Sequence, residues 1–139
     1  MSNEKIGIIG QGFVGTAIRE GMKNHFTIET YDKFKEELSS CSSLREVCEK
    51  VHIVFTCLPT PMKPTGECDL SILEETVREI NSFNLGNIVV IKSTVIPGTT
   101  ERLNEECANV DIVFNPEFLT EANYIDDFKN QNRIIIGGP

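Results

Sequence analysis

Short apolar runs recur along the chain, separated by longer stretches in which apolar and polar residues mix. The runs occupy residues 5–9, 26–31, 51–57, 87–91, 111–114 and 133–136. Most are continuous blocks of Val, Ile and Phe, which is typical of strands that are buried on both faces of a parallel sheet. The pattern therefore predicts six short strands.

Helical spacing appears between these runs. After the first run, apolar residues recur every three or four positions over residues 13–22, and the same spacing returns over residues 72–80. Ser71 followed by Glu74 predicts a capping box at the start of the second helix. We expect weaker helices near residues 100–108 and 121–128, and one or two short helices within 33–50.

The alternation of strands and helices predicts an α/β fold of Rossmann type. We expect a doubly wound, mainly parallel six-stranded sheet with helices on both faces. With 139 residues, 40% of them hydrophobic, the chain is long enough to bury one core. No internal repeat or linker divides it, so we expect a single domain over residues 1–139.

Composition and charge exclude several classes of protein. Charged residues at 24%, with 10 Gly and 6 Pro, exclude collagen and low-complexity disorder. No apolar run is long enough to span a bilayer, and the first residues do not resemble a secretion signal, so we expect a cytoplasmic protein with no membrane partner. A net charge of -8 argues against nucleic acid as a partner.

The cysteines do not form a metal-binding or disulfide pattern. There are 5 of them, an odd number, without a C-x-x-C pair or interleaved histidines. They lie at Cys41, Cys48, Cys57, Cys68 and Cys107. We expect reduced thiols with structural roles, and no metal site.

The glycine-rich segment after the first predicted strand is the strongest sign of function. It reads Gly10, Gln11, Gly12, Phe13, Val14, Gly15 and leads directly into the first predicted helix. In this context Gly10 permits a tight turn, Gly12 lets the backbone approach a pyrophosphate, and Gly15 lets helix and strand pack closely. Free N–H groups and the helix dipole then attract the phosphates. The segment predicts a dinucleotide site, the alternative being a glycine turn without a ligand.

Asp32 ends the second apolar run, 20 positions after Gly12. A carboxylate at this place accepts hydrogen bonds from the adenosine ribose hydroxyls and repels a 2′-phosphate, so it favours NAD over NADP. Lys33 and Lys35 lie close enough to weaken that discrimination, and Lys35 is a candidate for holding the adenosine end. The alternative for Asp32 is a solvated turn residue.

Three further segments each follow a predicted strand. They are Pro59-Thr60-Pro61, the run from Lys92-Ser93-Thr94 to Thr99, and Asn115-Pro116-Glu117-Phe118-Leu119-Thr120-Glu121. The carboxyl edge of an open α/β sheet is where ligands bind. Together with the glycine segment and residues 133–138, these motifs resemble the amino-terminal domain of the UDP-glucose/GDP-mannose dehydrogenase family over nearly the whole chain.

The resemblance implies a reaction and roles for matching residues. Enzymes of that family oxidise the primary alcohol of a nucleotide sugar to a carboxylate with two NAD in succession, through a cysteine thioester. Cofactor contacts would come from Pro59, Thr60, Ser93, Thr94 and Glu121. Thr94 would also help hold the catalytic water, and Glu117 would act as an acid/base or water-positioning group. The alternatives are that Thr94 satisfies backbone groups in a turn and that the two glutamates cap the following helix.

Family members are about three times longer, and the resemblance places the cysteine nucleophile in the part that this chain does not contain. We therefore expect an NAD-binding domain of a nucleotide-sugar dehydrogenase, without the middle and nucleotide-sugar-binding domains, whose chemistry is completed elsewhere. Nucleotide sugar would be a partner only when those domains are supplied, and we allow for a homo-oligomer. The alternative is a separate or vestigial NAD-binding or regulatory module without turnover.

Overall fold

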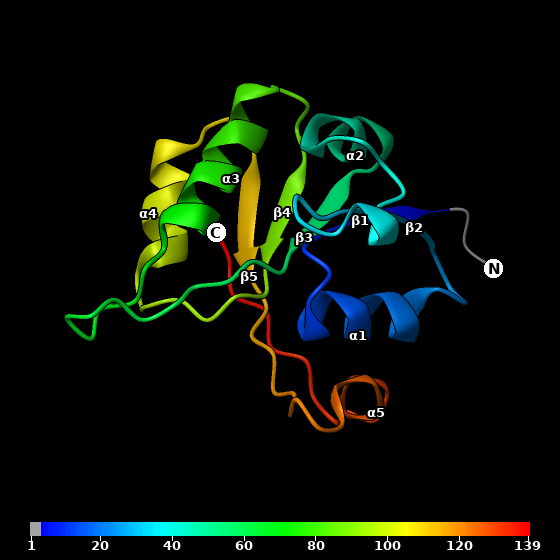
Figure 1. Ribbon diagram of the computed structural model, residues 1–139. Helices are drawn as coiled ribbons and strands as arrows, with labels where there is room; N and C mark the ends of the chain where they lie inside the picture. The colour runs from blue at the N-terminus through cyan, green and yellow to red at the C-terminus, as the bar shows by residue number, and fades with distance from the viewer. Residues whose placement is uncertain (1–3) are drawn as a thin grey trace.

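The computed structural model describes residues 4–139, which form a parallel sheet with helices on both faces (Figure 1). Its strands are β1 (Lys5–Ile9), β2 (Thr27–Tyr31), β3 (Ile53–Thr56), β4 (Ile88–Ile91) and β5 (Asp111–Phe114). The helices are α1 (Phe13–Met22), the 3₁₀ turn η1 (Glu36–Leu38), α2 (Leu44–Lys50), α3 (Ser71–Ser82), α4 (Thr99–Glu106) and α5 (Tyr124–Lys129). The Rossmann-type fold class is confirmed.

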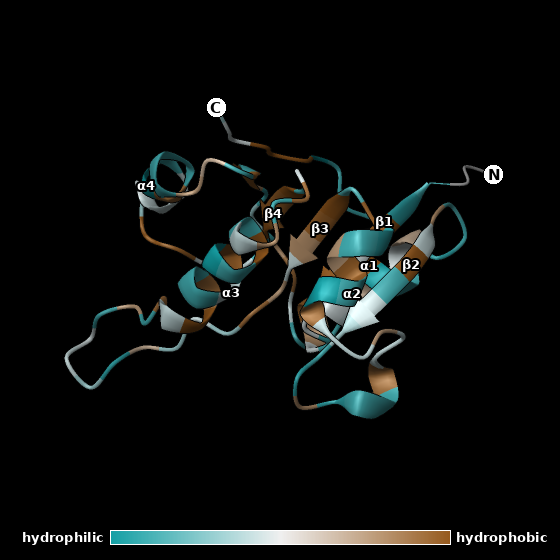
Figure 2. Ribbon diagram, turned by 90° about the horizontal axis from the view of Figure 1, so that it is seen from above, coloured by the Kyte–Doolittle hydropathy of each residue, from teal (hydrophilic) through white to brown (hydrophobic). Residues whose placement is uncertain are grey.

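Alternating side chains of the strands enter two different layers. One face of the sheet packs against α2, α3 and α4, and the other carries α1, with α5 packed against α1 (Figure 1). The α3 helix illustrates the cause, because Leu73, Val77 and Ile80 are spaced to share one buried stripe while its charged residues face water. Figure 2 shows the apolar residues gathered along β3 and β4, in the middle of the sheet.

The order of the strands creates a switch point at one edge. The sheet runs β2-β1-β3-β4-β5. The chain therefore crosses from β1 to β2 in one direction and from β3 to β4 and β5 in the opposite direction. In register, Ile9 lies opposite Tyr31 and Thr56, and Ile91 lies opposite Thr56 and Phe114. The carboxyl ends of all these strands therefore meet at one edge, where such folds bind ligands.

The predicted sixth strand is wrong. Residues 133–136 are not a strand, and Ile134 and Ile136 are 69% and 68% exposed. Only Gly137 bridges Phe114, in the antiparallel sense. In that register residues 133–136 lie beyond the end of β5, where no strand backbone faces them. Their β-branched composition indicated a strand, but composition does not report whether a partner exists.

The predicted capping box at α3 is also wrong. Ser71 is the first residue of the helix, and Asp69 accepts hydrogen bonds from the Ser71 N–H at 3.0 Å and from its hydroxyl at 2.7 Å. Glu74 instead pairs with Arg78 and with Arg102 of α4. Asp69 accepts the hydrogen bonds at the helix start, so the Glu74 side chain is available to pair with arginines of α3 and α4.

Within residues 4–139, none of the helices combines the length and the apolar character needed to cross a bilayer.

Candidate active site

The glycine segment forms the turn between β1 and α1. Gly10 has φ of +93°, and a Cβ built on it would lie 2.3 Å from the Cys57 carbonyl oxygen, so only glycine fits. A Cβ on Gly15 would lie 2.0 Å from the Gly10 carbonyl oxygen, which explains the close packing of helix on turn. A Cβ on Gly12 would meet nothing within 4 Å. Gly12 therefore borders open space, at the N-terminus of α1.

That open space suits a phosphate group. Gly12 is the N-cap residue of α1, and no side chain caps the helix. The N–H groups of the first turn have no intrahelical acceptor and carry the positive end of the helix dipole. A pyrophosphate lying against Gly12 would accept hydrogen bonds from these groups, so the residues present fit a dinucleotide.

Gln11 holds the turn in place through nearly all its polar atoms. Its side chain is buried, its Nε2 donates to the Gly10 carbonyl at 3.0 Å, and its Oε1 accepts from Arg19 of α1 at 2.9 Å. Its backbone N–H donates to Asp32 and its carbonyl accepts from Lys35. The role of Arg19 was not predicted, because its two-turn separation from Gln11 leaves no local pattern in the sequence.

Asp32 and Lys35 reach the glycine turn from the end of β2. Asp32 Oδ2 accepts the Gln11 N–H at 2.7 Å, and Oδ1 accepts the Phe34 N–H at 2.9 Å. The Lys35 ammonium donates to the Gln11 carbonyl at 3.0 Å. Asp32 is half-buried, shapes its own turn and places a carboxylate next to the glycine turn.

The loops after β3 and β4 are bonded to each other. The Ser93 hydroxyl donates to the Leu58 carbonyl at 2.7 Å and accepts the Leu58 N–H at 3.1 Å. The Thr60 hydroxyl donates to the Thr94 carbonyl at 2.7 Å. Pro59 and Thr94 are exposed. The two loops therefore form one surface at the carboxyl edge, with the Thr94 side chain available on it.

The predicted glutamates follow β5. Glu117 is half-buried, and its Oε2 accepts the Leu119 N–H at 2.6 Å. Glu121 is exposed in the turn before α5. Neither glutamate caps that helix, which begins at Tyr124 after the N-cap residue Asn123. Across residues 4–139, no hydrogen bond or ion pair joins Glu121 to the other candidate residues.

Comparison with known proteins decides the family. Residues 18–139 match the model described as "UDP-glucose/GDP-mannose dehydrogenase family, NAD binding domain". The chain belongs to this family. The UDP-glucose 6-dehydrogenase of Rickettsia bellii is 36% identical over 107 residues, which cover 73% of this chain and 25% of that protein. The GDP-mannose 6-dehydrogenase of Pseudomonas aeruginosa is 30% identical over 151 residues, covering 99% and 34%.

A solved structure agrees with this assignment. The UDP-glucose dehydrogenase of Pyrobaculum islandicum superposes with a TM-score of 0.87 at 26% identity, covering 99% of this chain and 41% of that one. The chain is thus the family's NAD-binding domain, and NAD is its cofactor. It spans between a quarter and about two fifths of the length of these relatives.

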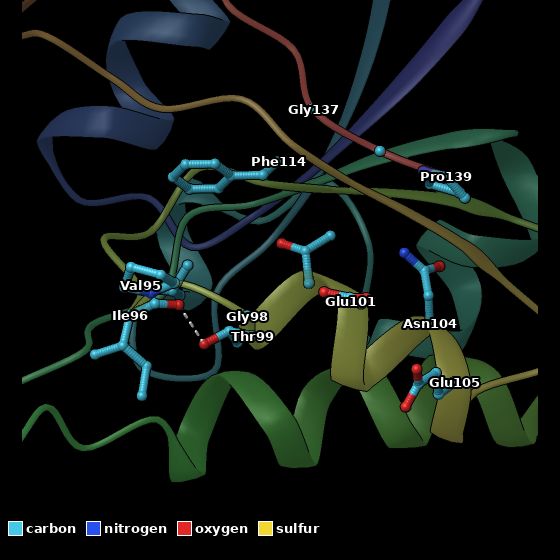
Figure 3. A pocket seen from close by; sticks show the side chains of 13 residues that line it. Val95, Ile96, Gly98, Thr99, Glu101, Asn104, Glu105, Phe114, Gly137 and Pro139 are labelled. Carbon is cyan, nitrogen blue, oxygen red and sulfur yellow. Dashed lines mark hydrogen bonds between the residues drawn. The ribbon is translucent and has the colours of Figure 1, made fainter.

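A separate cavity of about 840 Å³ lies between α4, the loop before it and the last residues of the chain (Figure 3). Val95, Ile96 and Phe114 line its apolar side, and Glu101 and Asn104 of α4 lie on the other side. None of the lining residues is one of the predicted site residues. The cavity begins one residue after Thr94 and so lies beside the predicted site.

The cysteines of this family member are all free. Burial raises the pKa of the Cys57 thiol to about 12, and that of Cys48 also to about 12. The Cys68 thiol, near the predicted site, donates weakly to the carbonyls of Thr60 and Thr94 at 3.8 and 3.9 Å. Burial also raises the pKa of the Cys41 and Cys107 thiols, so Cys41, Cys48, Cys57 and Cys107 favour the protonated thiol. No group of metal ligands occurs among residues 4–139.

Proposed function

We propose that this chain is the NAD-binding part of a nucleotide-sugar 6-dehydrogenase, which oxidises the primary alcohol of a UDP-glucose or GDP-mannose type of substrate to a carboxylate. The observation that carries the proposal is the meeting of the glycine turn, the Lys92 to Thr94 loop and the Asn115 to Glu121 loop at one edge of the sheet. The names of the relatives, UDP-glucose and GDP-mannose 6-dehydrogenases, supply the substrate class.

The residues at the β1 and β2 ends would bind and orient the cofactor. N–H groups at the start of α1 would bind the pyrophosphate, with Gln11 keeping the turn in shape. The Asp32 carboxylate would accept a hydrogen bond from an adenosine ribose hydroxyl, with Lys35 beside it. When bound, NAD supplies the acceptor for the hydride that leaves the sugar carbon.

Residues in the loops after β3, β4 and β5 would position or accept the hydroxyl proton that the alcohol loses when it is oxidised. Loss of a hydride from an alcohol leaves a hydroxyl proton that a base or an ordered water must accept. The exposed Thr94 side chain would hold such a water, and the Glu117 carboxylate would orient it or take the proton. Thr60, whose hydroxyl is bonded to the Thr94 carbonyl, would keep that loop in place beside the nicotinamide, and Glu121 would approach the same end.

The thiol that forms the thioester would come from outside these residues. Burial raises the pKa of four of this chain's thiols, Cys41, Cys48, Cys57 and Cys107, and makes them poor nucleophiles. The chain alone would then bind NAD without completing the oxidation.

The test is to mix the purified chain with NAD and either UDP-glucose or GDP-mannose and to follow NADH by absorbance. The same mixtures are repeated with a polypeptide that carries the family's cysteine and sugar-binding domains. We expect NAD binding in every case and NADH only in the presence of the added polypeptide. NAD binding with no NADH in any combination would favour the separate binding module instead.

A further inference from the structure

Lys92 is a buried lysine that the proposed chemistry does not yet use. It is the first residue after β4 and is only 5% exposed. Its ammonium donates to the Asn115 Oδ1 at 2.9 Å. Among residues 4–139, no carboxylate lies within ion-pair distance of it, and burial lowers its pKa. Lysine is rarely buried so completely without an ionic partner.

The neighbours of Lys92 belong to the ends of adjacent strands. The backbone ladder continues one residue past the strands, since Lys92 donates its N–H to the Thr56 carbonyl at 3.1 Å and Asn115 donates its N–H to the Ile91 carbonyl at 3.0 Å. The Glu117 carboxyl and the Cys57 thiol are the titratable groups close enough to influence the ammonium. Lys92 therefore lies between the turn after β3 and the loop after β5.

Asn115 connects Lys92 to the final segment of the chain. Its Oδ1 accepts from Lys92, and its Nδ2 donates to the Ile135 carbonyl at 2.8 Å. Phe114, the residue before Asn115, donates its N–H to the Gly137 carbonyl at 2.7 Å. The Lys92–Asn115 pair thus ties the loop that carries Thr94 to the loop that carries Glu117 and to the final segment.

Stability alone does not account for a lysine here. The preceding residues of β4 are Ile and Val, and an apolar side chain at position 92 would avoid the cost of burying an ammonium against a neutral amide. The lysine adds a directional hydrogen bond. A charged donor with one defined acceptor fixes the relative placement of two loops better than an apolar contact does.

We propose that Lys92, acting through Asn115, is a positioning residue that sets the loop after β4 against the loop after β5, so that both present their side chains to the nicotinamide end of the cofactor. This inference rests on the proposed function. The inference concerns only the nicotinamide half of the cofactor. The adenosine and pyrophosphate half would be bound by the glycine turn and Asp32, which do not contact Lys92.

The test compares the affinities of the chain for NAD and for ADP-ribose, which lacks the nicotinamide. We expect Lys92→Met and Asn115→Ala each to weaken NAD about tenfold and to leave ADP-ribose within about twofold. Lys63→Met, at an exposed lysine in the loop before α3, should change neither affinity. Unchanged ADP-ribose binding also shows that the variants are folded.

A second variant separates positioning from structural support. The double variant Lys92→Met with Asn115→Leu removes both polar side chains of the pair. Neither is then left without its partner, so the melting temperature should be higher than in the single variants. The lower NAD affinity should persist. Recovery of NAD affinity along with stability would overturn the proposal, as would equal losses for both ligands or equal wild-type affinities for NAD and ADP-ribose. A wild-type chain that binds neither ligand would refute the proposed function itself.

Discussion

Two glycines of the same turn differ in what they tolerate. At Gly10 a side chain would meet the Cys57 carbonyl at a left-handed φ of +93°, whereas at Gly12 a Cβ meets nothing within 4 Å. We expect Gly10→Ala to lower the free energy of unfolding by about 2–4 kcal/mol through strain and collision. Gly12→Ala should stay within about 1 kcal/mol of the wild type. Urea unfolding of both variants checks this, and equal losses would contradict the assigned roles.

Asp32 should decide between the two cofactors. Its carboxylate lies against the Gln11 N–H, where a 2′-phosphate would be repelled. We expect Asp32→Asn to reduce the preference for NAD over NADP by about tenfold, the size of a lost charged hydrogen bond. Glu37→Gln, at a nearby exposed acid, is the control. Binding titrations with both cofactors measure the ratio, and an unchanged ratio would assign the discrimination to other residues.

Single residues were predictable where spacing alone dictates their task. Gly10, Gly12 and Gly15 occupy the places in the turn that their spacing indicated. The interaction of Gln11 with Arg19 and the burial of Lys92 were not predictable, since both depend on side chains that meet only after the helices and strands have packed. The functional roles of Thr94, Glu117 and Glu121 stay predictions.

At the scale of elements, a carboxylate of α5 holds the end of the Asn-Pro-Glu loop. Asp127 Oδ2 accepts the Thr120 hydroxyl at 2.6 Å and its N–H at 2.9 Å, and these bonds lower the pKa of Asp127 from its ordinary 3.8. A pKa lowered by folding means that the contact stabilises above the unfolded pKa and is lost as the pH falls through the folded one.

We therefore expect the NMR resonance of the Thr120 amide to shift as the pH falls below the ordinary pKa of an aspartate, when Asp127 becomes protonated. Asp127→Asn should abolish this titration, and Asp126→Asn, at the exposed neighbour, should preserve it. A Thr120 amide that titrates identically in all the proteins would show that the contact is absent in solution.

Elements were predictable where a run is both apolar and paired. The strand over residues 111–114 was placed to the residue, and the one or two short helices expected within 33–50 occur as η1 and α2. The sixth strand failed because the apolar run at 133–136 lies beyond the end of β5 and has no partner. Periodicity reports which side chains suit burial, whereas pairing depends on where the chain returns to the sheet.

At the scale of the whole molecule, several large apolar side chains toward the end of the chain are open to solvent. Phe118 is 51% exposed, and Ile134 and Ile136 are more exposed still, at 69% and 68%. Exposed apolar groups of this kind favour association. We expect sedimentation velocity to show concentration-dependent self-association that is reduced when Ile134 and Ile136 are both changed to Ser. A chain that stays monomeric at every concentration would contradict this expectation.

The whole molecule is an acidic domain whose cofactor, NAD, is an anionic dinucleotide. The local N–H groups and dipole of α1 must therefore outweigh a net charge of -8.

The most direct measurement is a calorimetric titration of the chain with NAD and with NADP, repeated on Gly12→Val. We expect saturable NAD binding, weaker NADP binding, and loss of NAD binding in the variant with its fold retained, because the new side chain fills the space in front of α1. Absence of NAD binding by the wild-type chain, or full binding by Gly12→Val, would contradict the assignment of the dinucleotide site.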